Sequence, residues 1–266
     1  MPLFGPPNVE KLEKKGNVKR LIKALSYHRD RPDKPGSRGK YVRRDAARAL
    51  GEIGDPGMVA PLVEALQDPD IDVRQEAISA LGAFGLPEVV EPLIERLGAS
   101  DTHGAEKERI VETLGEIGDR RAVEPLIEAL NAEDLGLRRK AAGALAKIGD
   151  PRAKQPILSA LLSSERKWTI ESLAEALEQF VGSDRDLFLK ALADPGTRDQ
   201  AAIALDHLGW TPEIDTASAY YWIAKRDWER CAALGNAAVE PLVFSLPSET
   251  EEERIHILHA LGTMRN

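Results

Sequence analysis

The chain has 266 residues, with 36 Lys and Arg against 44 Asp and Glu, a formal net charge of -8 and 42% hydrophobic residues. This composition is typical of a soluble globular protein and excludes a disordered chain. No apolar stretch approaches the roughly 18 residues that a membrane-spanning helix needs, and residues 1–16 lack the apolar core of a secretory signal. We therefore expect a cytoplasmic protein that makes no membrane contact.

Residue usage favours an all-α fold. The chain contains 35 Ala and 32 Leu but only 13 aromatic residues, and helices favour Ala and Leu whereas strands favour β-branched and aromatic residues. The single cysteine, Cys231, excludes an internal disulfide and a cysteine-based zinc site. Its isolation fits a reducing compartment.

Charge is distributed unevenly along the chain. Residues 1–50 hold 14 Lys or Arg and 5 Asp or Glu, a net charge of +9, so residues 51–266 carry -17. The sequence thus predicts a basic amino-terminal end on a long acidic body, and such an asymmetry bears on the choice of binding partner.

The chain contains an internal repeat. Four similar segments end in glycines that are 31, 33 and 31 residues apart, namely Gly54, Gly85, Gly118 and Gly149. A second similar block follows each glycine, and its prolines keep the same spacing, at Pro61, Pro92, Pro125 and Pro156. Because two blocks keep one spacing over four units, the sequence predicts stacked copies of one structural unit.

Each unit has the pattern of a helical hairpin. In residues 44–55, RDAARALGEIGD, apolar residues recur every three or four positions, which is typical of one face of a helix. Gly54 suits the left-handed residue that ends a helix, and Asp55 can cap the next helix. That helix begins late or bends because of Pro61. One hairpin cannot bury both apolar faces, so neighbouring hairpins must share a core.

These blocks resemble the HEAT repeats, in particular the short HEAT-like units of the phycobilisome-lyase type. The resemblance is carried by ARALGEIGD (Ala47–Asp55) and VEPLIEAL (Val123–Leu130), and it covers residues 19–162 closely and the remainder loosely. It implies an all-α, right-handed α–α superhelix, an α-solenoid of HEAT-like helical hairpins. Such an architecture says little about function.

We expect a single HEAT-repeat solenoid over residues 1–266. Its expected parts are an amino-terminal cap (1–17), regular repeats (18–162), degenerate repeats (163–209), a helical insertion (210–235) and a carboxy-terminal repeat (236–266). The insertion is expected to form two short helices that are broken near Arg226 and Asp227.

Arginines recur at the start of the second helix of each unit, at Arg43, Arg74 and Arg138, with Lys107 at the matching position. The resemblance implies that this arginine ladder is structural and holds the turns between hairpins together; ligand binding is the alternative. Asp70 and Asp72 are the expected partners of Arg74 or of its equivalent in the next unit.

No catalytic residue, cofactor site or metal ligand is assigned. The deoxyhypusine hydroxylases, a HEAT-like family, bind iron through His-Glu pairs, and no such dipeptide occurs in this chain. Glu252, His256 and His259 share one helical stripe and could in principle bind a metal, but a solvated helix is the favoured interpretation. Neighbouring arginines could lower the pKa of Cys231, yet its Ala-rich surroundings favour a small buried residue.

Two further segments are open to a structural or a functional interpretation. Five aromatic residues gather between Trp210 and Trp228, where core packing is favoured over an exposed docking patch around Trp222. The segment 26–44 is rich in Pro, Gly and basic residues and is expected to be a solvated loop or, alternatively, a site for phosphates or an acidic partner. Its basic residues include Arg29, Arg31, Lys34, Arg38, Lys40 and Arg44.

The favoured hypothesis is a non-catalytic protein-interaction module or scaffold that binds another protein on the surface of the solenoid. Candidate contacts on the second helices are Arg44, Arg48, Gln75, Ser79, Glu112, Arg139 and Lys140. The alternatives are a bilin-lyase-like accessory subunit and a protein that binds nucleic acid or phosphate through the basic loop. Wrapping of duplex DNA is disfavoured because residues 51–266 are strongly acidic.

Overall fold

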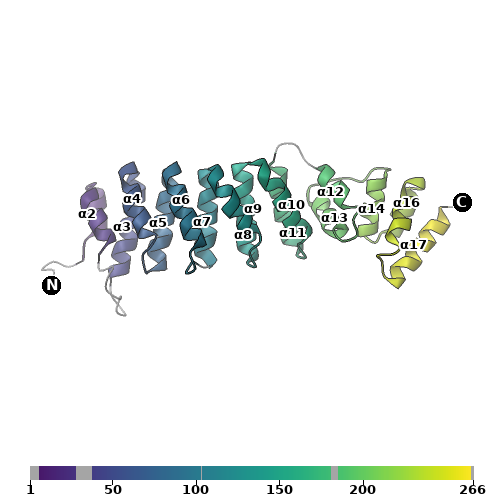
Figure 1. Cartoon of the computed structure of the whole chain (residues 1–266), viewed down its shortest axis with the longest axis horizontal. Coiled ribbons are helices and arrows are strands. Elements are labelled where there is room, and N and C mark those ends of the chain that lie inside the picture. Colours follow the sequence, from purple (N-terminus) through teal and green to yellow (C-terminus); the bar gives the residue numbers. More distant parts are fainter. Residues whose placement is uncertain (1–5, 28–37, 103, 181–184, 265–266) are drawn as a thin grey trace. The chain divides into compact units, whose positions relative to one another are not determined.

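A computed structural model describes residues 6–27, 38–102, 104–180 and 185–264. These residues form seventeen α-helices and four short 3-10 helices and contain no strand. The all-α expectation is therefore confirmed for the described part of the chain. The helices form two compact units, residues 1–150 (unit 1) and 151–266 (unit 2), and each unit is described separately (Figure 1).

Unit 1 is a stack of four helical hairpins preceded by one short helix. Its helices are α1 (Val9–Lys14), α2 (Val18–Leu25), α3 (Gly39–Ile53), α4 (Val59–Ala65), α5 (Ile71–Phe84), α6 (Val90–Gly98), α7 (Gly104–Ile117), α8 (Val123–Leu130) and α9 (Leu135–Ile148). The 3-10 helices η1 (Pro56–Met58), η2 (Pro87–Val89) and η3 (Arg120–Ala122) precede α4, α6 and α8. The helix α1, capped by the side chain of Asn8, was not predicted from the sequence.

The turn between one hairpin and the next follows from the Gly-Asp-Pro sequence. Gly54 ends α3 in the left-handed conformation, with φ +70°. The Asp55 carboxylate then accepts a hydrogen bond of 2.9 Å from the Gly57 amide, and Pro56 opens a 3-10 turn. Because this 3-10 turn precedes it, α4 begins only at Val59, and Pro61 lies in its first turn. An N–H group in the first turn of a helix has no partner within the helix, so the missing N–H of proline has no cost there. The late start expected from the proline is confirmed.

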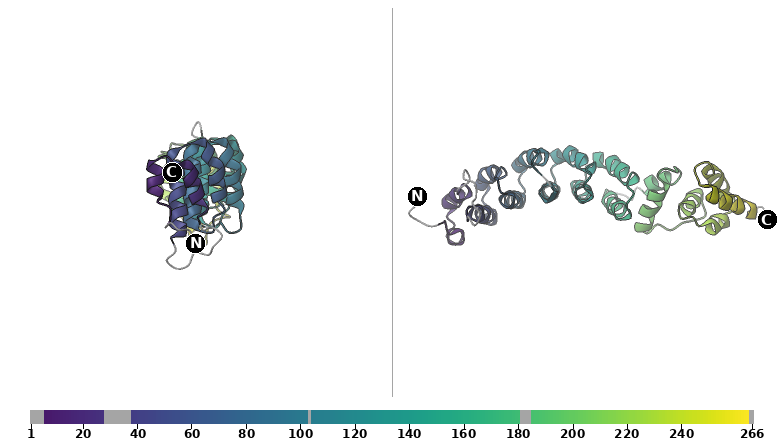
Figure 2. Two further views of the ribbon diagram at one scale, coloured as in Figure 1. Left: turned by 90° about the vertical axis from the view of Figure 1, so that its left-hand side faces the viewer. Right: turned by 90° about the horizontal axis from the view of Figure 1, so that it is seen from below.

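The second helix of each hairpin in unit 1 packs directly against the second helix of the next one. The helices α3, α5, α7 and α9 thereby form one continuous row, and Figure 2 shows the helices of unit 1 end-on in two rows. Leu50, Leu81, Leu114 and Leu145, the leucines of the repeated Leu-Gly or Leu-Ala pair, are completely buried between the rows. Unit 1 is thus a small helical solenoid with one shared core.

Unit 2 begins with the 3-10 helix η4 (Pro151–Ala153). It continues with α10 (Lys154–Leu162), α11 (Lys167–Glu178), α12 (Arg185–Ala191), α13 (Arg198–His207), α14 (Thr216–Ala224), α15 (Trp228–Ala233), α16 (Asn236–Ser245) and α17 (Glu251–Thr263). The helices α14 and α15 lie in the segment predicted to be an insertion, and Arg226 between them adopts the left-handed conformation, with φ +56°. No helix in either unit's described part is long and apolar enough to cross a membrane.

Candidate functional site

The predicted contact residues of the second helices lie on one row of adjacent helices in unit 1. Arg44 and Arg48 come from α3, Gln75 and Ser79 from α5, Glu112 from α7, and Arg139 and Lys140 from α9. All are exposed or half-buried. We call this surface, made by the outward side chains of α3, α5, α7 and α9, the second-helix surface.

Ion pairs join many of the charges on the second-helix surface. On α3, Arg44 binds Asp45 at 2.8 Å. Between α7 and α9, Lys140 Nζ lies 2.8 Å from Glu112, and this hydrogen bond is the main cause of the lowered pKa of Glu112. The Lys140–Glu112 pair connects two neighbouring hairpins, whereas the Arg44–Asp45 pair lies within α3. Arg48, which lies 3.7 Å from Asp45, has a side chain that is 51% exposed and is accessible to a partner.

Arg43 and Arg74 of the predicted arginine ladder are buried and structural, whereas Arg138 and Lys107 are half-buried. The guanidinium of Arg43 donates two hydrogen bonds, of 2.8 and 3.1 Å, to Asp68 in the next hairpin. Arg74 likewise donates bonds of 2.9 and 2.8 Å to Glu106, which also accepts a bond of 2.8 Å from Arg96. Burial raises the pKa of Glu106, but the hydrogen bonds from the two arginines outweigh it and leave the pKa below its ordinary value.

The prediction that Asp70 and Asp72 are the acidic partners of the ladder arginines was wrong. Asp70 and Asp72 pair with Lys40 of α3, at 3.2 and 3.7 Å, rather than with Arg74. Asp70 is the N-cap of α5 and accepts a hydrogen bond from the Asp72 amide, so its carboxylate is held at the helix end. Asp68 lies in the turn that Arg43 reaches, and a charge buried there needs a partner.

The ladder arginines also hold the turn of their own hairpin. Arg74 donates to the carbonyl oxygen of Asp68 and Arg138 to that of Ala132, each six residues earlier. The same bond recurs in unit 2, from Arg198 to Leu192. Arg198 therefore belongs to the ladder, although it was not predicted from the sequence. One sequence pattern could have identified it. Arg198 precedes Leu205 by seven residues, just as Arg74 precedes Leu81.

Arg198 and Arg226 share the carboxylate of Glu249 in unit 2. Arg198 Nη1 lies 3.2 Å from Glu249, whose side chain is 8% exposed. Arg226 binds Glu253 at 2.6 Å and lies 3.8 Å from Glu249. Burial lowers the pKa of Arg198 and raises that of Glu249. This cluster ties the insertion to α13 and α17.

The predicted basic loop is only partly described. Arg29, Arg31 and Lys34 lie outside the described residues, so their role stays a prediction. Arg38 is exposed and precedes α3. Lys40 is engaged with Asp70, whose hydrogen bond is the main cause of its raised pKa.

The aromatic residues of the insertion mostly pack inside unit 2. Tyr221 is buried and donates a hydrogen bond to Asp206; burial is the main cause that raises its pKa to about 12. Trp222 is half-buried, stands edge-on to the Tyr221 ring at 4.8 Å, and lies under the guanidinium of Arg230 at 4.7 Å. The core interpretation is confirmed for Tyr221, and docking by Trp222 stays a prediction.

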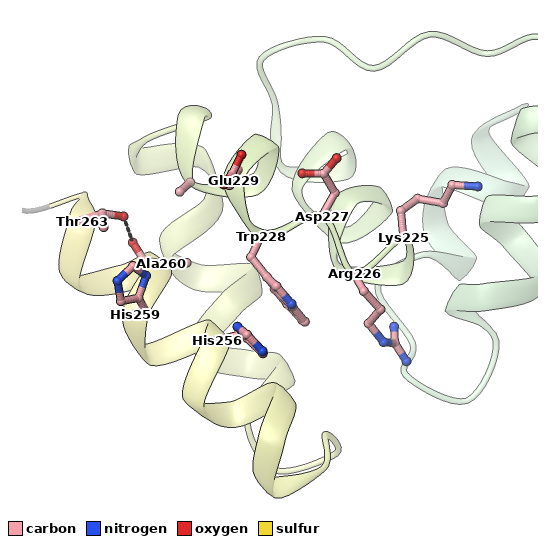
Figure 3. A pocket seen from close by; sticks show the side chains of 10 residues that line it. Lys225, Arg226, Asp227, Trp228, Glu229, His256, His259, Ala260 and Thr263 are labelled. Atoms are coloured by element: carbon pink, nitrogen blue, oxygen red, sulfur yellow. Dashed lines mark hydrogen bonds between the residues drawn. The ribbon is translucent and has the colours of Figure 1, made fainter.

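A hollow of about 700 Å³ opens between α15 and α17. Figure 3 shows Trp228 and His256 next to each other on its wall, with ring planes 3° apart and centroids separated by 6.3 Å. His256 and His259 are exposed, as expected of a solvated helix. The described residues contain no group of three His, Cys, Asp or Glu side chains placed to hold a metal ion.

Cys231 is completely buried in the core of unit 2. Burial, together with the nearby Asp227, raises its thiol pKa to about 12. The favoured interpretation of Cys231 as a small buried residue is therefore confirmed, and the neighbouring arginines do not lower its thiol pKa.

Comparison with known proteins identifies the repeats. A family model described as HEAT repeats matches residues 36–106 and 98–178. Comparison with curated proteins found no match. The HEAT part of the predicted resemblance is thereby confirmed.

Several solved structures are similar to the chain at low identity. The complex of CpcE and CpcF of phycocyanin lyase from Nostoc sp. PCC7120 is 20% identical, with 92% of this chain and 94% of that chain covered and a TM-score of 0.49. Human deoxyhypusine hydroxylase in complex with glycerol is also 20% identical, with 96% and 99% covered and a TM-score of 0.29. An engineered protein is 21% identical, with 97% and 80% covered and a TM-score of 0.40. These values are too low to assign an activity to the chain.

Proposed function

Because the chain belongs to the HEAT-repeat family, we propose that it is a non-catalytic protein-interaction module that binds an extended or helical segment of another protein. The second-helix surface of unit 1 is the proposed binding surface. Stacked helical repeats present long surfaces of this kind, to which each repeat contributes a few side chains.

The observation that carries this proposal is the change of charge from one second helix to the next. Equivalent outward positions are occupied by Arg44 on α3, Gln75 on α5, Glu108 on α7 and Arg139 on α9. This row of positions is therefore basic, neutral, acidic and basic in turn, and neighbouring positions are about 10 Å apart because of helix packing. A segment with the complementary charge order would be selected in one register.

Charge reversal on this surface tests the proposal. The wild-type protein and the double variant Arg48→Glu/Arg139→Glu are immobilised and exposed to a displayed library of random 20-residue peptides. We expect peptides selected on the wild type to carry acidic residues and to lose most of their affinity for the double variant, because both exchanged side chains are exposed.

The matched control is Lys19→Glu/Arg20→Glu, which makes the same charge change on exposed positions of α2, outside the second-helix surface. This variant should keep the selected peptides. Selection of no peptide above background, or equal binding of the selected peptides by Arg48→Glu/Arg139→Glu, would contradict the proposal.

A further inference from the structure

The hairpin formed by α16 and α17 exposes five large apolar side chains. Val239, Val243 and Phe244 of α16 are 40–57% exposed, and Ile255 and Leu258 of α17 are 64% and 58% exposed. The opposite sides of both helices pack against α14 and α15. We call the surface formed by Val239 of α16 and by Leu258 and Gly262 of α17 the open hairpin face. Clustered exposed apolar residues of this size commonly mark a binding site.

The open hairpin face corresponds to the surface that other hairpins use to bind the next hairpin. Gly262 follows the Ala-Leu pair of α17, as Gly51 does in α3 and Gly82 and Gly115 do after the equivalent leucines. A β-carbon on any of those three glycines would lie 2.6–2.7 Å from a residue of the next second helix. A β-carbon on Gly262 would meet nothing within 4 Å. The position that makes the closest contact between hairpins is therefore open in α17.

Two apolar residues near Gly262 are likewise exposed at positions that are more buried in the earlier repeats. Leu258, which is 58% exposed, matches Ala47, Ile78 and Val111 in the earlier repeats, all of them fully buried. On the first helix, the 40% exposed Val239 matches Val90 and Val123, both fully buried, and Val59, which is half-buried. These comparisons place Val239, Leu258 and Gly262 in register with the interfaces between hairpins inside the chain, whereas Phe244 and Ile255 match the outward Glu95 and Arg44.

The ladder arginine of the same hairpin indicates the charge that a hairpin bound to this face would carry. Arg254 stands at the ladder position and donates to the carbonyl oxygens of Leu246 and Pro247 in its own turn. Arg43 and Arg74 bind in addition a carboxylate of the following hairpin, whereas Arg254 forms no ion pair with any carboxylate in the described ranges. A neighbour that repeats the pattern would bring an acidic residue to Arg254.

We propose that the open hairpin face binds a helical hairpin of the same repeat type that belongs to another polypeptide. The bound hairpin carries a small residue against Gly262 and a carboxylate toward Arg254, as Ala80 and Asp68 do for Gly51 and Arg43. The interface continues the hairpin-to-hairpin contact already present in unit 1, and it is separate from the second-helix surface.

A second copy of this chain is a poor fit to the same position. In the first hairpin of that copy, Ala49 is the residue equivalent to Ala80, so Ala49 would have to contact Gly262. Ala49 is 1% exposed, and α1 already packs against α3. Binding a second copy would therefore require α1 to leave its place.

A synthetic peptide with the sequence of residues 59–85 is a suitable probe, because this segment contains Asp68 and Ala80 and makes these contacts to α3 within the chain. The fluorescein-labelled peptide is titrated with the full protein, and its anisotropy is measured. We expect binding to the wild type that weakens about tenfold or more with Gly262→Leu, because the added side chain overpacks the contact. Replacing the aspartate at position 68 of the peptide by lysine should also weaken binding.

Gly262→Leu should fold normally, since its surroundings are open and leucine favours a helix; thermal unfolding checks this. Gly98→Leu, at another open glycine in unit 1, is the control and should bind the peptide like the wild type, as should Arg48→Glu/Arg139→Glu. Failure of the wild type to bind, or equal binding by Gly262→Leu, would overturn the proposal. So would a wild-type dimer in sedimentation that Gly262→Leu converts to a monomer, because a second copy would then occupy the face.

Discussion

Gly51 of α3 lies so close to Ala80 of α5 that a β-carbon on the glycine would stand 2.7 Å from the alanine β-carbon and 3.0 Å from its α-carbon. The same relationship recurs one hairpin further, where Gly82 faces Thr113, and again where Gly115 faces Ala144. The glycine of the repeated Leu-Gly pair therefore sets the separation of the second helices. This close approach allows α3, α5, α7 and α9 to form one continuous surface.

Adding a methyl group at these glycines should destabilise unit 1 in a graded way. In Gly115→Ala the new β-carbon meets backbone and side-chain atoms of Ala144 at 2.6 Å, so we expect a loss of about 1–3 kcal/mol in the free energy of unfolding. Gly51→Ala should lose a similar amount. Gly82→Ala should lose less, because the nearest atom is a methyl group of the Thr113 side chain, which can rotate. Urea unfolding of the three variants measures these losses in the free energy of unfolding and thereby their order.

Gly143→Ala is the matched control for this series. Gly143 lies within α9, and a β-carbon added to it would meet nothing within 4 Å. Alanine should therefore stabilise the helix by up to about 1 kcal/mol. Equal effects at Gly115 and Gly143 would show that the close packing does not limit these positions.

The local features of the hairpins could be predicted from the sequence, because they depend on neighbouring residues. The left-handed Gly54, the cap at Asp55 and the late start before Pro61 each follow from the conformational limits of one residue type. The repeat spacing predicted the stacking for the same reason, since an unsatisfied apolar face on one hairpin requires another hairpin.

The partners of the buried charges could not be predicted in this way. Asp68, Asp70 and Asp72 are close in sequence, and only their depth in the turn decides which of them reaches Arg43. The sequence did not indicate that Glu106 binds two arginines, because these arginines come from two other helices, α5 and α6. Nor does the sequence report that the Leu-Gly glycine touches the neighbouring helix rather than merely ending a stripe.

Glu106→Gln should strongly destabilise the protein. The carboxylate is fully buried and accepts hydrogen bonds from Arg74 and Arg96, whose side chains are 9% and 2% exposed. Glutamine retains the size of the side chain but removes the carboxylate that pairs with the buried Arg74, and it leaves Arg96 with only the exposed Asp101. Losing one partner of such a buried ion pair costs about 3–5 kcal/mol, so the urea midpoint should fall markedly. Glu91→Gln, at an exposed ion pair with Arg121, is the control and should change stability by less than about 1 kcal/mol.

The capping glutamate of α17 should make part of the stability depend on acid pH. Bonds from the Thr250 backbone and side chain, in that order of importance, lower the pKa of Glu253 from 4.5 to about 2. Because the pKa in the folded protein is depressed, this stabilisation is complete above pH 4.5 and is lost as the pH falls from 4.5 toward 2. Glu253→Gln can still cap the helix but cannot titrate.

The measurement is the melting temperature of the wild type and of Glu253→Gln between about pH 3 and pH 7, a range that covers most of this transition. We expect the wild type to melt higher above about pH 5 and the difference to shrink steadily below pH 4.5. A difference that stays constant over this range would mean that Glu253 titrates at its ordinary pKa in the folded protein.

Cys231 should be inert toward alkylation in the folded protein. Its thiol is fully buried and its pKa is raised to about 12, first by burial and then by Asp227. At about pH 8 only about one thiol in ten thousand is then ionised, and the thiolate is the reactive form. Intact mass after treatment with iodoacetamide should show no adduct for the native protein and one adduct in denaturant.

A cysteine placed at the exposed position 229 on the same helix, in the variant Cys231→Ala/Glu229→Cys, should react in the native state. Rapid native alkylation of the wild type would instead show that α15 opens readily and exposes the core beneath it.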